Sequence, residues 1–96
     1  GDTVALGARA TATETDATAL GESASATGFA ALAVGASSSA SAIRAIAVGR
    51  GAAADGDTAT ALGANAQASG ANSTALGGGS STLNSARAVG QWSIAI

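Results

Sequence analysis

Residues 58–63 read TATALG, and nearly the same letters stand at 72–77 as NSTALG and at 44–49 as RAIAVG. The glycines that close these stretches, here called the anchor glycines, are spaced fourteen residues apart: Gly7, Gly21, Gly35, Gly49, Gly63 and Gly77. Each follows an alanine two positions earlier and a Leu or Val one position earlier, and the residue three positions earlier is Val, Thr, Leu or Ile. A fixed interval of this kind indicates a repeat architecture, in which every repeat forms the same structural unit.

The second half of each repeat alternates small and polar side chains. Small residues stand three and five positions after the anchor glycines: Ala10 and Ala12, Ala24 and Ala26, Ser38 and Ala40, Ala52 and Ala54, Ala66 and Ala68, Ser80 and Thr82. Mostly polar residues lie between them, and this period of two predicts a β-strand with two different faces. The positions seven after the anchor are Glu14, Gly28, Ala42, Gly56, Gly70 and Asn84. Their preference for Gly and Asn predicts a turn with positive φ.

Each repeat is therefore predicted to form two short strands and two turns. An α-helix is disfavoured because the apolar residues lack a helical period and Ser, Thr and Gly are abundant. Stacked coils of this type form an all-β fold, a parallel β-solenoid of fourteen-residue coils in which each coil adds about 4.8 Å. Six to seven coils then give a rod about 30 Å long. The absence of proline agrees with this fold, since inner strands need their N–H groups for both neighbours.

A coil of fourteen residues encloses only a flattened tube, so we expect the alanine positions to face inward. The Leu/Val positions and the Val/Thr/Leu/Ile positions then lie outside the first strand and form an apolar stripe, which is typical of an interface. We expect copies of the same chain to cover the stripe. The predicted interface residues are Val4, Leu6, Leu20, Leu32, Val34, Ile46, Val48, Leu62 and Leu76. The alternative reverses the faces and places Leu and Val inside one wide single-chain roll.

The composition argues against several classes of function. The chain has 96 residues, with Lys+Arg 4 against Asp+Glu 6 and a net charge of −2. Nucleic-acid-binding proteins normally carry a basic surface, and membrane-surface binding needs clustered Lys or Arg, so we expect neither partner. Without Cys or His the chain lacks thiolate and imidazole ligands and a histidine base. We therefore expect no metal, no cofactor and no catalysis. DGD at 55–57 is interpreted as an Asp-Gly turn.

The repeat, x-(Val/Thr/Ile)-Ala-(Leu/Val)-Gly-x-x-Ala-x-Ala-x-Gly, resembles the head domain of trimeric autotransporter adhesins, the YadA-like heads of Gram-negative bacteria. SIAI at 93–96 matches the family motif best. The resemblance implies a left-handed parallel β-roll with three chains around one axis. It also implies a non-catalytic adhesive head on the bacterial outer membrane surface, which attaches the cell to host cells or to matrix proteins such as collagen.

The resemblance covers nearly the whole chain, and residues 1–96 are interpreted as one head domain fragment of a longer protein. Regular coils are expected over residues 1–84 and an irregular C-terminal coil over residues 85–96, because Gly90 follows Gly77 by thirteen residues. Either SARAVG at 85–90 is a shortened coil, or residues 85–92 are an insertion. Trp92, Ile94 and Ile96 alternate as in a strand, and Trp92 is expected to plug the core.

Two sets of surface residues are candidates for contact. The solvent side of the second strand is expected to face the ligand, with Ser23, Ser25, Asn65 and Gln67 as the candidate residues. Phe29 and Ile43 share one turn position in successive coils and are expected to pack against a neighbouring subunit, with ligand contact as the alternative. The pairs Asp16/Arg44 and Glu22/Arg50 stand two coils apart, too far to touch within a chain, and they are candidates for pairing across subunits.

Two other functions remain open at this point. The chain is also interpretable as a passive spacer that holds another tip away from the cell. An ice-binding solenoid presents flat rows of threonine, and Thr18, Thr60 and Thr74 share a row here, although Leu32 and Ile46 interrupt it.

Overall fold

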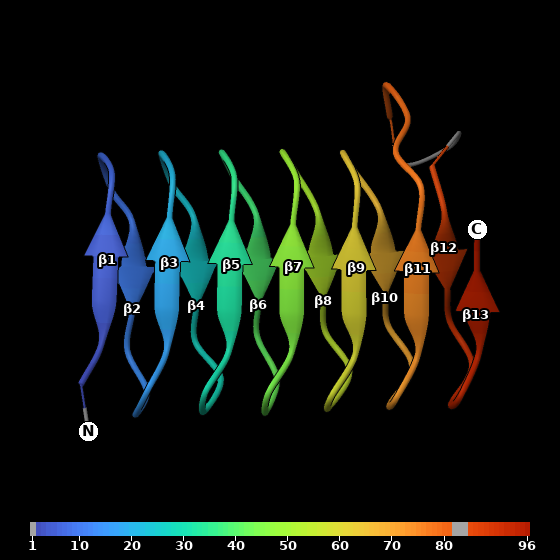
Figure 1. Ribbon diagram of the computed structural model, residues 1–96, viewed down its shortest axis with the longest axis horizontal. Coiled ribbons are helices and arrows are strands. Elements are labelled where there is room, and N and C mark those ends of the chain that lie inside the picture. The colour runs from blue at the N-terminus through green and yellow to red at the C-terminus, as the bar shows by residue number, and fades with distance from the viewer. Residues whose placement is uncertain (1, 82–84) are drawn as a thin grey trace.

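The structure is a computed structural model that describes residues 2–81 and 85–96, and these residues form short β-strands joined by turns. The odd-numbered strands make up a seven-stranded sheet: β1 (Val4–Leu6), β3 (Thr18–Leu20), β5 (Leu32–Val34), β7 (Ile46–Val48), β9 (Thr60–Leu62), β11 (Thr74–Leu76) and β13 (Ile94–Ala95). The even-numbered strands make up a six-stranded sheet: β2 (Thr11–Ala12), β4 (Ser25–Ala26), β6 (Ser39–Ala40), β8 (Ala53–Ala54), β10 (Gln67–Ala68) and β12 (Arg87–Ala88). The sheets lie one behind the other, with a row of turns along each long side (Figure 1).

Neighbouring strands pair in parallel, each with the strand one coil away. Ala19 of β3 lies beside Ala5 on one side and Ala33 on the other, so the pairing keeps the fourteen-residue spacing of the sequence. The longest extent of the molecule is 32 Å, close to the rod of about 30 Å that coil stacking predicts. The predicted parallel β-solenoid with fourteen-residue coils is confirmed.

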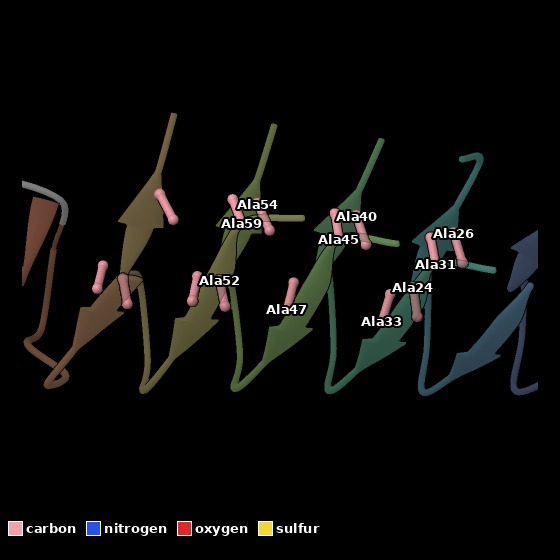
Figure 2. Packing of buried hydrophobic residues seen from close by; sticks show 14 of the residues in the cluster. Ala24, Ala26, Ala31, Ala33, Ala40, Ala45, Ala47, Ala52, Ala54 and Ala59 are labelled. Atoms are coloured by element: carbon pink, nitrogen blue, oxygen red, sulfur yellow. The ribbon is translucent and has the colours of Figure 1, made fainter. Parts of the chain in front are cut away.

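Alanine fills the space between the sheets. The central alanine of each inner strand of the first sheet is 0% exposed: Ala19, Ala33, Ala47, Ala61 and Ala75. Alanines of the second sheet point toward them (Figure 2), and the molecule measures only 12 Å along its shortest axis. The inward orientation of the small side chains is thereby confirmed. The alternative with Leu and Val inside is wrong, because sheets that meet through methyl groups lie too close together for longer side chains.

A further inward row was missed in the sequence. It lies four residues before the anchor glycines from Gly21 to Gly77, just before the strand of the first sheet, and Ser93 holds the same place before β13: Ala17, Ala31, Ala45, Ala59, Ser73 and Ser93. Four alanines in successive repeats were the available signal. The row faces inward because the alternation of β3, β5 and the later strands continues beyond the residues that pair. Ser73 is 0% exposed, and its Oγ has no hydrogen-bond partner.

The turns are tight and use left-handed residues. In one of them the Ala31 N–H donates to the Gly28 carbonyl at 3.1 Å, and Ala30 between them has φ 55°. A hydrogen bond of this span with positive φ at the third residue is typical of a type II β-turn. The third positions with positive φ are Arg9, Ser23, Ser37, Gly51 and Asn65 in one row and Asp16, Ala30, Arg44, Thr58, Asn72 and Trp92 in the other.

The glycines seven residues after the anchor have a different role from the one predicted. Gly28, Gly56 and Gly70 do not have positive φ. A Cβ built on Gly28 would lie 2.1 Å from the carbonyl oxygen of Ala42 in the next coil. Glycine is therefore favoured here because successive backbones approach closely, and the left-handed residue lies two positions later. Asn84, which was assigned to the same row, lies outside the described residues.

The register of β12 locates the irregular stretch. Arg87 pairs with Gln67, twenty residues away instead of fourteen, so six extra residues (20 − 14) are present. Gly79 still occupies its regular position, and Ala86 is the next residue in register. The extra residues therefore fall between Gly79 and Ala86.

Both interpretations of the C-terminal stretch are consequently wrong. Residues 85–90 contain β12 and complete an ordinary coil, and Gly90 lies against Gly70 rather than taking the place of an anchor glycine. Ser80 is exposed instead of facing inward, and Thr82 lies outside the described residues. The coil boundaries were misplaced because the six extra residues before Ala86 shift every later residue relative to the fourteen-residue repeat. The match of SIAI to the motif is confirmed, since Ile94 pairs with Thr74.

Trp92 does not plug the core. Its side chain is 70% exposed, and the residue occupies the third position of a turn with φ 65°. The interior accepts Ala and Ser, so an indole ring has no place there. Ile94 and Ile96 instead extend the outer rows of the first sheet, where they are 70% and 93% exposed.

Candidate binding surfaces

The outer face of the first sheet carries a continuous apolar stripe. All nine predicted interface residues lie in two adjacent rows of this face, in register along the solenoid: Val4, Leu32 and Ile46 in one row and Leu6, Leu20, Val34, Val48, Leu62 and Leu76 in the other. Val4, Leu6 and Leu62 are 44%, 63% and 38% exposed, and the remaining members are half-buried by their neighbours in the rows. The geometry provides a long, flat, apolar surface without a pocket in the described part of the chain.

Threonine interrupts the larger apolar residues of the first row at Thr18, Thr60 and Thr74. Thr18 pairs with Leu32, and Thr60 pairs with Ile46 on one side and Thr74 on the other. The stripe is accordingly most apolar in the two middle coils, those of β5 and β7.

Phe29 and Ile43 enlarge the apolar surface next to those middle coils. Both stand on turns between the sheets and are 43% and 44% exposed. They share their row with Thr15, Asp57 and Ala71, so they form an isolated apolar pair on one edge of the solenoid. Their predicted packing against a neighbouring subunit stays a prediction.

The four predicted ligand-facing residues lie in two places on the second sheet. Ser25 and Gln67 are on β4 and β10, whereas Ser23 and Asn65 are on the turns that precede those strands. The two places are three coils apart, or about 14 Å at the usual strand spacing. No single small ligand therefore touches all four residues, whereas an extended polymer is long enough.

Three of these four side chains already contact a neighbouring coil. Arg9 Nε donates to Ser23 Oγ at 3.3 Å, and Asn65 Nδ2 donates to the Gly79 carbonyl at 3.0 Å. Gln67 Oε1 accepts from Arg87 Nε at 3.1 Å. A ligand that binds here has to replace these hydrogen bonds or add to them.

The charged side chains of the described residues are exposed. Arg9 Nη2 and Glu22 Oε2 form an exposed ion pair at 3.6 Å. Asp55 Oδ1 accepts from Ser41 Oγ at 2.9 Å, and Asp57 Oδ1 accepts from the Ile43 N–H at 3.3 Å, so the DGD segment is tied to the preceding coil. Across residues 2–81 and 85–96 no group of three or more acidic side chains is close enough to hold a metal ion. The same residues contain no helix that could span a membrane.

Comparison with protein families gives a match to the model described as YadA head domain repeat (2 copies), at residues 1–24, 26–52 and 54–80. The chain belongs to this family. Each matched segment covers about two coils of the solenoid, and the last ends where the extra residues between Gly79 and Ala86 begin. The match confirms the resemblance to a YadA-like head domain of a trimeric autotransporter adhesin. Among curated proteins the chain has no match.

Proposed function

We propose that this YadA-like head is an adhesive module that works as a homotrimer on the bacterial surface. Each copy, residues 1–96, is a left-handed solenoid. Three copies pack their apolar stripes around a common axis and turn their second sheets outward. The outward faces attach a Gram-negative cell to a host matrix protein such as collagen or to the host cell surface, without catalysis. Membership of the family and the exposed stripe support this proposal.

The observation that carries the proposal is the imbalance between interior and surface. Fully buried hydrophobic side chains in the described residues are all alanines, whereas Leu, Val and Ile stand outside. Burying one such large side chain stabilises by about 1.5–3 kcal/mol, more than an alanine methyl contributes. A trimer that covers the stripe therefore gains more from burial than the single chain does, and small domains depend on such gains.

The outward face binds weakly at each position and strongly as an array. Three identical faces on one rod raise the effective concentration at a surface carrying repeated ligands, which increases affinity by about 10²–10⁴ without any new contact. We assign the ligand-facing role to Ser23, Ser25, Asn65 and Gln67, which are polar and half-exposed.

The test combines mass and adhesion. We expect light scattering at micromolar concentration to give three times the 8.7 kDa of the chain. The same trimer is expected to bind an array of matrix proteins, collagen included, or cultured epithelial cells. The double variant Ser25→Glu, Gln67→Glu is expected to keep the mass and to lose binding. A monomer in dilute buffer, or a trimer with no signal on array and cells, contradicts the proposal.

The two alternatives give different results in related assays. If the chain is only a spacer that holds a separate binding domain away from the cell, deleting the spacer from the whole protein leaves the adhesion per exposed binding domain unchanged. If the threonine row binds ice, the purified chain shows thermal hysteresis, which an adhesin face does not produce.

A further inference from the structure

The two long edges of the solenoid carry opposite charge. The edge formed by the turns from the first sheet to the second, here called the basic edge, carries Arg9, Glu22 and Arg50 and has a net charge of +1. The edge formed by the turns from the second sheet to the first, here called the acidic edge, carries Asp2, Glu14, Asp16, Arg44, Asp55 and Asp57 and has a net charge of −4 (+1 − 5). Arg87 on β12 is the remaining charged residue. The two edges are the upper and lower rows of turns in Figure 1.

Residues seven apart in the sequence stand on opposite edges, half a coil apart along the rod. Half a coil is about 2.4 Å, so two such residues lie at nearly the same height. Arg50 is matched in this way by Asp57, and Arg9 is matched by Asp16. These partners cannot meet within one chain, because they lie at opposite ends of the strands in a molecule 25 Å wide. Arg50 and Asp57 are both exposed, and neither forms an ion pair within the described residues.

Side-chain size is matched in the same way. Phe29 and Ile43, two large apolar residues of the acidic edge, lie half a coil below and above Ala36 of the basic edge. The basic edge thus has a small residue at the height where these two side chains stand. The cation of the acidic edge, Arg44, is level with the uncharged Ser37 and Gly51.

We infer that the basic edge of one copy packs against the acidic edge of the next, with Arg50 opposite Asp57 and Arg9 opposite Asp16 of the neighbouring copy. The inference rests on the proposed trimer and names the contact that closes it. A ring about an axis parallel to the rod brings unlike edges together at equal height, which makes every interface head-to-tail. A dimer that packs the stripes face to face with the two copies antiparallel would bring like edges together, and the acidic pair would repel. Charge therefore keeps the copies parallel.

The inference is tested by charge reversal on the 96-residue chain. Arg50→Glu and Asp57→Arg are made singly and together, and dissociation is followed by light scattering in a dilution series. Each contact occurs three times in the ring. We therefore expect either single variant to raise the concentration at which half of the trimer is dissociated by about tenfold. The double variant restores the pair with reversed polarity and is expected to return close to the wild-type midpoint. High salt is expected to reduce the difference.

Arg87→Glu is the matched control, because it makes the same charge change as Arg50→Glu but lies on β12, outside both edges. It is expected to leave the midpoint unchanged, and circular dichroism melting shows whether each variant is folded. A wild-type trimer that tolerates both single reversals, or a double variant that stays weakened, overturns the edge contact and leaves the trimer standing. A wild-type monomer overturns the proposed head and the edge contact together.

Discussion

Ser73 and Ser38 are two buried serines of the interior that differ in their hydrogen bonding. Both serines are 0–1% exposed among the core alanines. Ser38 Oγ donates to the Gly35 carbonyl at 2.8 Å, whereas Ser73 Oγ has no partner. A buried polar atom without a hydrogen bond costs about 1–3 kcal/mol of stability. The hydroxyl of Ser73 is therefore expected to destabilise the fold, whereas that of Ser38 is not.

We expect Ser73→Ala to raise the free energy of unfolding by about 1 kcal/mol, because it removes an unsatisfied hydroxyl and leaves a methyl group that the core accepts. Thermal unfolding followed by circular dichroism measures the change. Ser38→Ala is the matched control, and it is expected to be neutral or destabilising. Equal shifts in both variants would show that the missing partner of Ser73 has no energetic consequence.

The turns are the elements in which sequence and backbone agree least. Ala30 has φ 55°, a region that costs an L-residue other than Gly, Asn or Asp about 1–2 kcal/mol. Asn72 occupies the equivalent position three coils later, with φ 60°. The stack holds Ala30 in this conformation, since its N–H donates to the Thr15 carbonyl at 2.9 Å.

We therefore expect Ala30→Asn to stabilise the fold by about 0.5–1 kcal/mol, because Asn adopts the left-handed conformation more easily. The melting temperature measures the effect. The control is Ala31→Asn, one residue later in the buried row, which is expected to destabilise strongly. A lower melting temperature for Ala30→Asn would mean that strain does not govern this turn.

The elements also show what could be predicted from the sequence. The strands and their inner and outer faces could be predicted, because small and polar side chains alternate along a pleated strand and this alternation recurs in the repeats. The row of Ala17 and its equivalents was missed because it lies outside the paired strand residues. The role of Gly28 was misassigned because positive φ and close backbone approach select the same residue. Trp92 was misplaced because hydrophobicity alone does not report the width of the interior.

At the scale of the whole molecule, the exposed stripe is the surface on which the proposed trimer can be tested. Leu62 is 38% exposed in the single chain, so a charge there costs the lone solenoid little. It costs much more if another copy covers the position, because a buried unpaired carboxylate is strongly unfavourable.

We expect Leu62→Asp to dissociate or unfold the assembly, whereas Gln67→Asp, on the outer face of β10, keeps the trimer. Sedimentation velocity at matched concentrations separates the two results. Both variants add the same charge, one on the apolar stripe and the other on the opposite sheet. If both remain trimeric, the interface lies elsewhere than on the first sheet.

The placement of the candidate contact residues could be predicted only in outline. The sequence pattern located all nine residues of the stripe on one face, because a row in a solenoid is a column in the aligned repeats. It did not reveal that Ser23 and Asn65 stand on turns, since the strands of the second sheet are only two residues long. The charge difference between the edges became visible only when the turns were placed in space.

The six extra residues between Gly79 and Ala86 have a practical consequence for engineering. After them β12 and β13 rejoin their sheets in register, so coil stacking does not depend on a constant number of residues in this turn. The equivalent junction between Asn65 and Ala66 should therefore accept a short peptide tag. We expect a chain with six added residues there to keep its β-sheet circular dichroism, and a loss of that signal would restrict such tolerance to the last coil. A fibre of this design could then carry foreign epitopes at chosen heights.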